Sequence, residues 1–549
     1  MKFKPLPRLG APLLPLYASA FLVLAYNFTF WKTFALATGG ANLANAPVYA
    51  GAFLLLVLLF NAILTLLNFR FVIKPVLVLL FIGASFSTYF MNQYGIVIDS
   101  SMVQNVIETD VREANELFSW KMVQTVTILG ILPAFVVWKL PLEFRPVRRD
   151  LLAKLGIVVF SLLAVAGLLL MLFKTLAPAI REHRELRFLL TPTNMFQATH
   201  GYLKRKWATP LVIAPLGTDA SRGPKWAASA ASGKHTVTLI VVGETARSMN
   251  FSLNGYSRDT NPQLARQKDL VNLSNVSSCG TATAVSVPCV FSDFPRDDYT
   301  AEKARSQEGL LDVLRHAGFD VLWRDNNSGC KGVCDRVRYE DLSQPVAGDP
   351  LCNTEECFDE RLLRGLPEMI RNAEKDMVIV LHQKGSHGPA YAKRYPAAFG
   401  KFGPVCQTNE LEQCSRESIV AAYDNTILYT DHVISAAIDI LRAAAEEGKA
   451  DTSLVYFSDH GESLGEKNMY LHGAPYIISP AEQRSVPMML WLSQGFRSRF
   501  GIDNDCLGAR SKQPFSHDNV FHSVLGMLNV STAVYNPKLD LFHACTRGT

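Results

Sequence analysis

The sequence HTVTLIVVGE at residues 235–244 is a run of β-branched and other apolar residues that ends on an acidic side chain. Further short apolar runs lie at 318–323, 376–382, 452–459 and 487–493. A strand that is apolar at every position is typical of a sheet covered on both faces. Helical runs lie between these strands, at 309–317, 360–372 and 418–445. This alternation predicts an α/β domain with a mostly parallel sheet.

Long apolar runs precede this domain. They lie at about 13–36, 48–67, 71–90, 123–140 and 155–176. A bilayer core of about 30 Å requires roughly 20 helical residues, and each run is close to that length. The first run is too long for a signal peptide and lacks a clear small-residue cleavage site, so we expect it to remain as a span. The sequence therefore predicts a five-helix transmembrane domain over 1–177, a linker with short helices over 178–235, and the α/β domain over 236–549.

The composition excludes two broad classes of protein. Of 549 residues, 49% are hydrophobic and only 19% are charged, which excludes a mainly disordered chain. A net charge of +5 without a dense basic patch is not typical of a nucleic-acid-binding protein, so we expect no nucleic-acid partner.

The basic residues of the first half predict the orientation in the membrane. One side of the bilayer collects most of them: Lys2, Lys4, Arg8, Arg70, Lys74, Lys139, Arg145, Arg148, Arg149 and Lys154. The side rich in Lys and Arg is expected to be cytoplasmic. With a cytoplasmic N-terminus, five crossings place everything after about residue 177 on the opposite side.

The cysteines support the same orientation. All ten lie from Cys279 onward. Their even number and close spacing favour disulfides in an oxidising compartment. The alternative is metal-binding thiols, because Cys330 and Cys334 have the spacing of a zinc knuckle, but the other gaps differ from a zinc ribbon.

One loop between predicted spans, at 99–121, has an unusual polar pattern. Asn105, Thr109 and Glu113 recur every four residues, so a helix would align them on one face. Spacing alone favours a solvated amphipathic helix at the membrane surface. The alternative is a polar face that contacts a lipid headgroup.

Acidic and histidine residues follow three of the predicted strands. Glu244 follows the first strand, Asp459 and His460 end another, and His382 ends a third, with His387 five residues further. Because the carboxyl ends of parallel strands meet at one edge of the sheet, these residues are expected to converge. Carboxylate and imidazole ligands suit Zn²⁺. An acidic residue after a strand is more often a helix cap or a solvated loop residue than a metal ligand. The convergence of Glu244, Asp459 and His460 on one edge makes a metal site about as well supported as that ordinary role.

The segment CGTATAVSVPC at 279–289 contains a candidate nucleophile. Two cysteines bracket small hydroxyl-rich residues before a predicted helix, whose N-terminus would favour a phosphate. A Thr or Ser hydroxyl on a metal ion can lose its proton and attack phosphorus. Composition alone favours an ordinary helix cap.

Several motifs together carry a family resemblance. They are VVGETAR (241–247), NFSLNGY (250–256), SCGTATAVSVPC, NNSGCKGVCDR (326–336), GSHGP (385–389) and SDHGESLGE (458–466). In this order and spacing the sequence resembles the lipid A phosphoethanolamine transferases, which belong to the alkaline-phosphatase/sulfatase-like superfamily. The resemblance covers the whole chain and implies five spans followed by a periplasmic α/β/α sandwich domain of alkaline-phosphatase/sulfatase type.

The resemblance also implies roles for individual residues. The zinc ligands would be Glu244, Thr283, Asp459 and His460, and Thr283 would be the nucleophile that carries phosphoethanolamine. His387 and His472 would act beside it, on the phosphoryl group, on a second zinc or in proton transfer. Substrate contacts would come from Ser328, Lys331, Asn105, Thr109 and Glu113, which reverses the interpretation of the 99–121 loop. The implied disulfides are 279–289, 330–334, 352–357 and 406–414, with 506–545 as the remaining pair.

The implied enzyme is a zinc-dependent phosphoethanolamine transferase of the bacterial inner membrane with a periplasmic catalytic domain. Its donor would be phosphatidylethanolamine and its acceptor lipid A or lipopolysaccharide. Transfer would proceed through a covalent phospho-threonine, release diacylglycerol, and lower the affinity of lipid A for cationic peptides such as polymyxin. We expect one zinc ion, leave a second open, and expect a monomer.

Other functions remain as alternatives. A phosphoglycerol transferase acting on a different envelope acceptor would share the fold and the metal. A sulfatase requires a Cys or Ser in C/S-x-P-x-R, which the loop around Thr283 lacks. A membrane-tethered binding module without catalysis would be expected to lack one or more metal-site residues, and all four are present.

Overall fold

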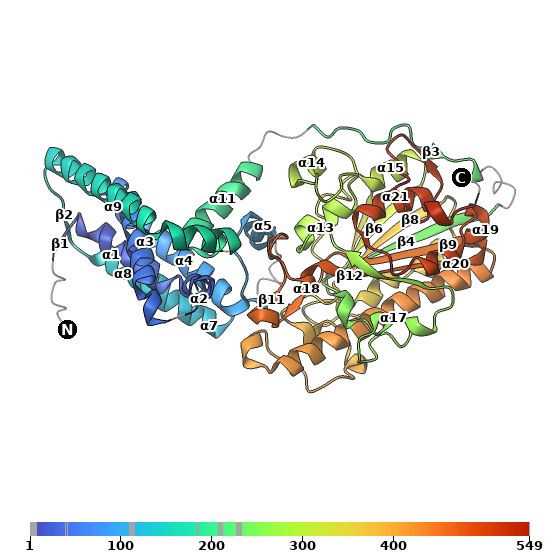
Figure 1. The fold of residues 1–549 in the computed structure, drawn as a ribbon. Helices are drawn as coiled ribbons and strands as arrows, with labels where there is room; N and C mark the ends of the chain where they lie inside the picture. Colours follow the sequence, from blue (N-terminus) through green and yellow to red (C-terminus); the bar gives the residue numbers. More distant parts are fainter. Residues whose placement is uncertain are drawn as a thin grey trace. The chain divides into compact units, whose positions relative to one another are not determined.

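The structure is a computed structural model that describes residues 8–38, 40, 42–108, 116–183, 186–206, 212–226 and 233–547. The chain divides into two compact units (Figure 1). The first comprises Met1–Val103 and Phe118–Lys204, and the second comprises Gln104–Leu117 and Arg205–Thr549.

The first unit is helical and apolar. Its described long helices are α1 (Leu13–Ala25), α2 (Phe28–Ala37), α3 (Ala46–Leu66), α4 (Ile73–Tyr94), the continuous segment Trp120–Lys139 that contains α7 and α8, and α9 (Val147–Glu182). Among the described residues, four helices are long and apolar enough to cross a membrane, and the bent pair α1–α2 makes a fifth span if it is counted as one.

The first predicted span is interrupted at Asn27. Its buried side chain donates from Nδ2 to Leu22 O and Thr191 O, each over 2.9 Å, and accepts from Thr191 N over 2.8 Å. This polar crossing ends α1, and α2 continues at an angle of 67°. Elsewhere, large apolar side chains such as Leu170 and Met171 on α9 are about 80% and 79% exposed, as expected for residues that contact lipid.

The second unit is built on an eight-stranded sheet. The strand order is β13-β5-β12-β9-β4-β8-β6-β7. The bounds are β4 His235–Gly243, β5 Val271–Ser277, β6 Asp320–Asp325, β7 Arg338–Asp341, β8 Met377–His382, β9 Ala450–Ser458, β12 Ser485–Leu492 and β13 Phe515–Ser516. All neighbours are parallel except that β12 is antiparallel to both β5 and β9.

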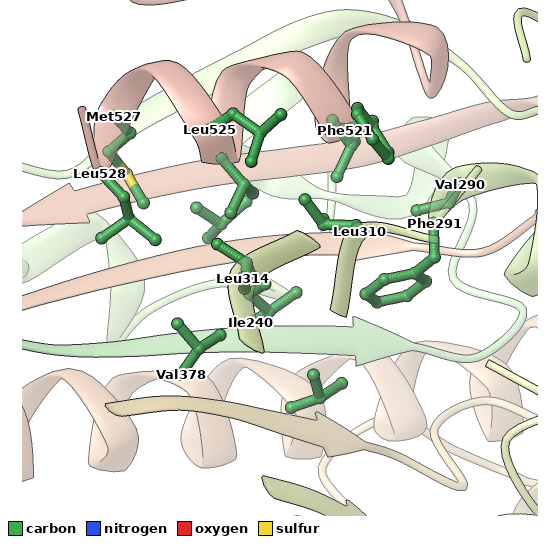
Figure 2. Close-up of a cluster of buried hydrophobic side chains, with 14 of the residues drawn as sticks. Ile240, Val290, Phe291, Leu310, Leu314, Val378, Phe521, Leu525, Met527 and Leu528 are labelled. Carbon is green, nitrogen blue, oxygen red and sulfur yellow. The ribbon is translucent and has the colours of Figure 1, made fainter. Parts of the chain in front are cut away.

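Both faces of the sheet are covered, as the continuous apolar strands predict. On one face Ile240 of β4 and Val378 of β8 pack with Leu314 of α15 (Leu310–His316) and with Phe521 and Leu525 of α21 (Asp518–Met527) (Figure 2). The other face is covered by α17 (Arg416–Glu446), the longest helix described in this unit (Figure 1). Successive side chains of a strand point to opposite faces, so β4 contributes to both layers.

Shorter α-helices and strands lie between these elements. The helices are α5 Ser100–Glu108, α10 Leu186–Leu189, α11 Thr193–Lys206, α13 Thr283–Val290, α14 Ala301–Arg305, α16 Leu366–Arg371, α18 Ala481–Arg484, α19 Gln494–Phe500 and α20 Asn504–Ala509. The strands are β1 Leu9–Gly10, β2 Leu142–Glu143, β3 Ser221–Arg222, β10 Ser463–Leu464, β11 Tyr470–Leu471 and β14 Val530–Ser531.

One detail differs from the sequence-based expectation, and the single antiparallel strand agrees with a mostly parallel sheet. The predicted helix at 360–372 is two pieces, a 3-10 turn at Asp359–Leu363 and α16, because Gly365 between them has φ of +72°. Strand β12 runs antiparallel because the chain leaves β9 at the rim, forms residues 459–484 there, and enters β12 from the same end.

The five disulfides are those that the resemblance implies: 279–289, 330–334, 352–357, 406–414 and 506–545.

Candidate active site

The centre of the site lies at the carboxyl ends of two neighbouring parallel strands. Gly243 of β4 is paired in register with Ser458 of β9, so Glu244 and Asp459 leave the sheet side by side. His460 follows directly. The three side chains are fully buried, and their ligand atoms all lie within 4.8 Å of one another. His460 Nε2 is 3.3 Å from Glu244 Oε1 and 3.4 Å from Asp459 Oδ2.

Thr283 joins this group from the first position of α13. Its hydroxyl lies 3.2 Å from Glu244 Oε1, 3.1 Å from Glu244 Oε2 and 3.4 Å from His460 Nε2. The loop before it is closed by the Cys279–Cys289 disulfide. Close packing also restricts the loop, because a Cβ at Gly280 would lie 2.9 Å from Ser286 N. The hydroxyl is therefore held against the carboxylate–histidine group.

The electrostatics of the group favour a bound cation. Burial raises the pKa of Asp459 to about 7, and the nearby Glu244 carboxylate adds to the rise. Burial opposes the charged form of His460 as well, but Asp459 and Glu244 together raise its pKa to about 10. Burial also disfavours ionised Glu244, yet the hydrogen bond and positive charge of His460 bring its pKa below the ordinary value. Two buried carboxylates repel each other, so a positive charge between them is required to keep both ionised.

The residues present fit a zinc ion. Asp459 Oδ2 is buried and accepts no hydrogen bond from any residue that the structure describes. Two carboxylates, one imidazole and one hydroxyl are available from Glu244, Asp459, His460 and Thr283. Oxygen and nitrogen donors in this number suit a four-coordinate Zn²⁺. His460 Nδ1 lies 3.0 Å from Gly461 O, which leaves Nε2 facing the carboxylates.

The two other predicted catalytic histidines lie against the same group. The rings of His460 and His472 are 4.4 Å apart between centroids, and those of His387 and His472 are 5.4 Å apart. His472 Nδ1 is 2.8 Å from Glu462 Oε2, so its Nε2 is the nitrogen left for a ligand. Glu462 in turn accepts from the Tyr391 hydroxyl over 2.6 Å. The resemblance did not single out Glu462, although it lies in the SDHGESLGE motif.

The loop after β6 contributes the predicted substrate residues Ser328 and Lys331. Lys331 Nζ donates to Ser328 Oγ over 2.9 Å and to Ser328 O over 3.0 Å. The Cys330–Cys334 disulfide closes this loop. Asn327, which sequence reasoning did not assign, donates from Nδ2 to Glu244 Oε2 over 2.7 Å. Ser328 thus directly follows a residue that contacts the centre, and Lys331 is hydrogen-bonded to Ser328.

His382, which the sequence places at the same sheet edge without a catalytic role, lies next to the centre, with its Nε2 3.4 Å from Asn327 Nδ2. It is fully buried, and its Nδ1 is 3.0 Å from Asp325 Oδ2. Burial opposes its charge, but the Asp325 carboxylate raises the pKa of His382 above its ordinary value. His382 ends a predicted strand, whereas Asp325 lies two residues beyond the predicted run at 318–323, because β6 extends to Asp325.

The structure describes only part of the residues that are predicted to contact the headgroup of the donor lipid. The backbone of Asn105 lies in α5, but its side chain is not described, and Thr109 and Glu113 lie outside the described residues. Glu116, just after them, forms an ion pair with Arg394. Arg394 also pairs with Glu356 and donates from Nε to His387 O over 2.7 Å. The backbone of His387 is therefore fixed by a buried guanidinium.

Comparison with known proteins gives two family matches. A family described as Sulfatase matches residues 236–530, and one described as Phosphoethanolamine transferase EptA/EptB matches residues 56–207. The chain is 40% identical over 534 residues to phosphoethanolamine transferase EptA of Escherichia coli K12, covering 97% of this chain and 96% of that protein. It is 39% identical to phosphatidylethanolamine transferase Mcr-1 of Escherichia coli, covering 86% of this chain and 88% of the other.

A solved structure agrees over the full length. The integral membrane lipooligosaccharide phosphoethanolamine transferase A of Neisseria meningitidis superposes with a TM-score of 0.93 at 35% identity. The match covers 99% of this chain and 100% of that one. The membrane unit and the sheet unit both therefore have counterparts in one solved protein.

Proposed function

The chain belongs to the phosphoethanolamine transferase EptA family, and we propose that it transfers phosphoethanolamine from phosphatidylethanolamine to a phosphate of lipid A. The observation that carries this proposal is the Thr283 hydroxyl, which donates to the buried Glu244 carboxylate beside Asp459 and His460. A single hydroxyl held in a carboxylate–histidine group suits a nucleophile that is phosphorylated and then dephosphorylated.

In the first step Thr283 Oγ1 attacks the donor phosphorus. The new Thr–O–P bond forms as the bond from phosphorus to the diacylglycerol oxygen breaks. Zn²⁺ bound by Glu244, Thr283, Asp459 and His460 would lower the pKa of the hydroxyl and balance the two carboxylates. The Thr283 hydroxyl proton passes to water, and the departing alkoxide would take a proton from His472, which is hydrogen-bonded to Glu462, or from the neighbouring His387.

In the second step an oxygen of a lipid A phosphate attacks the phospho-threonine. The bond from phosphorus to Thr283 breaks, and the threonine oxygen takes a proton from water. The N-terminal end of α13 and the Ser328–Lys331 pair favour the negative charge of the phosphoryl group in both steps. The added ethanolamine is cationic, so modified lipid A would bind cationic peptides such as polymyxin more weakly.

The reaction would take place at the periplasmic face of the bacterial inner membrane. The excess of Lys and Arg on one side supports a cytoplasmic N-terminus and a periplasmic catalytic domain. Both substrates are lipids, so a membrane anchor over 1–177, joined through 178–235 to the catalytic part at 236–549, would raise their effective concentration. Asn105, Thr109 and Glu113 would contact the donor headgroup, and the enzyme would act as a monomer with one zinc ion.

The test compares lipid A from cells that express the protein with lipid A from cells that express Thr283→Ala. Mass spectrometry should detect phosphoethanolamine only in the first sample. Intact mass of the purified protein incubated with phosphatidylethanolamine should show an adduct that Thr283→Ala lacks, and chelation should abolish transfer until zinc is returned. A phosphoglycerol adduct after a parallel incubation with phosphatidylglycerol, with none from phosphatidylethanolamine, would favour the alternative function, and an adduct on Thr283→Ala would refute the nucleophile.

A further inference from the structure

The amide of Asn327 has a fixed orientation toward Glu244. Its Nδ2 donates to Glu244 Oε2 over 2.7 Å and to Gln383 O over 2.9 Å. Its Oδ1 accepts from the backbone N–H of Ser328 over 2.8 Å. Since a backbone N–H can only donate, the amide cannot turn over without losing these bonds. The donating end of Asn327 must therefore face the Glu244 carboxylate.

A buried carboxylate holds the turn that carries Asn327. Asp325 Oδ1 accepts from the backbone N–H of Asn327 over 2.8 Å and of Gly329 over 3.2 Å. Its Oδ2 accepts from Trp323 Nε1 over 2.7 Å and lies 3.0 Å from His382 Nδ1. Both oxygens are occupied by donors from β6, β8 and the loop itself. The backbone of Asn327 is thus held by Asp325, and Asp325 is itself fixed because both of its oxygens have partners.

We propose that Asn327 is a positioning residue for zinc: it holds one oxygen of Glu244 so that the other faces His460, while the Thr283 hydroxyl contacts both oxygens. Glu244 Oε2 accepts the hydrogen bond from Asn327 Nδ2, whereas Oε1 is the oxygen 3.3 Å from His460 Nε2. This inference rests on the proposed zinc site. Carboxylates that bind metals are generally held by hydrogen bonds of this kind, and removal of the partner weakens metal binding about 10–100-fold.

The neighbouring asparagine offers a matched control. Asn326 is buried to a similar extent, with 3% exposure against 5% for Asn327. Its Nδ2 also makes two hydrogen bonds, to Cys357 O over 3.0 Å and to Asp359 Oδ1 over 2.8 Å. These partners are not part of the proposed metal site. Asn326→Ala therefore removes a buried amide from the same turn without removing a bond to Glu244.

The experiment measures zinc affinity of the full-length protein in detergent, by competition with a chromophoric chelator after metal removal. Asn327→Ala is expected to weaken zinc binding about 10–100-fold, and Asn326→Ala to leave it unchanged. In a Glu244→Ala background, Asn327→Ala should add no further loss, because its effect passes through Glu244. Excess zinc should return transfer activity to Asn327→Ala.

Several results would overturn the proposal. One is that Asn327→Ala binds zinc as tightly as the unchanged protein. Another is that Asn326→Ala and Asn327→Ala lose zinc affinity equally. A third is that Asn327→Ala lowers zinc affinity as much in the Glu244→Ala background as in the unchanged protein. Thermal unfolding of the metal-free proteins checks folding, and Asn327→Leu, similar in size, repeats the test if Asn327→Ala unfolds. Failure of both to fold would assign Asn327 a structural role instead. An unchanged protein that binds no zinc would overturn the zinc site itself, a result distinct from those above.

Discussion

Gly385→Ala should impair transfer because it displaces the backbone of Glu244. Gly385 has φ of +54°, a left-handed conformation that costs an alanine about 1–2 kcal/mol. A Cβ at this position would lie 2.6 Å from Glu244 O and 2.9 Å from Glu244 N. The carbonyl oxygen would have to retreat by 0.4 Å to reach 3.0 Å, and by 0.8 Å to reach the ordinary contact distance of 3.4 Å.

The size of this movement sets the expected loss of activity. A misplacement of about 1 Å at a reacting group costs about 100-fold in rate, so a shift of somewhat less is expected to lower kcat about 10–100-fold. The left-handed backbone should also lower the free energy of unfolding by about 1–2 kcal/mol. The two effects are separable because only the first depends on the contact with Glu244.

Gly365→Ala is the control for the backbone effect. Gly365 has φ of +72°, but a Cβ there would meet nothing within 4 Å. The assay measures phosphoethanolamine transfer to purified lipid A together with thermal unfolding. Gly365→Ala should lose stability and keep its transfer rate, whereas Gly385→Ala should lose both. Equal transfer rates in the two variants would refute the reasoning.

Two further predictions concern stability. Burial lowers the pKa of His517 to about 3, and its Nδ1 accepts from Cys279 N–H over 3.1 Å, so the folded state holds it neutral. The free energy of unfolding is therefore expected to fall by about 1.4 kcal/mol per pH unit as the pH drops from 6.5 toward 3, because only the unfolded state binds a proton at His517. His517→Gln should reduce this dependence on pH in thermal unfolding measured from pH 7 to 4. The same dependence in both proteins would contradict a neutral His517 in the folded state. Leu525→Ala, in the buried cluster of Figure 2, should cost about 2–5 kcal/mol in denaturant unfolding and leave zinc affinity unchanged, and a change in zinc affinity would show that the core and the site are coupled.

The central strands could be predicted because their side chains are apolar on both faces. Strands β4 and β8 coincide closely with the predicted apolar runs, and β9 begins two residues earlier than predicted. Their parallel register then brings Glu244 and Asp459 together, since residues that follow paired strands leave the sheet at one rim. Strand β5, whose sequence VNLSNVS is half polar, gave no such signal because only one of its two faces is consistently buried.

The neighbours of the centre could not be predicted in the same way. Asn327 and Glu244 are 83 residues apart, and Asp325 and His382 are 57 apart. An asparagine in a glycine- and cysteine-rich loop is an ordinary turn residue until the strand order is known. Sequence reasoning therefore identified the groups with distinctive chemistry and missed the amide and the carboxylate that orient them.

The nucleophile loop shows why contiguous motifs are insufficient to define this site. Ser278 O accepts from the Tyr476 hydroxyl, Cys279 N donates to His517 Nδ1, and Thr281 Oγ1 donates to Ala474 O, over 2.9, 3.1 and 2.6 Å. The partners are 198, 238 and 193 residues away along the chain. An attacking oxygen is effective only when it is held near its target, and here that constraint comes from two distant segments. A chain could keep every residue of the 279–289 motif and still misplace its threonine if the segment at 474–476 changed shape.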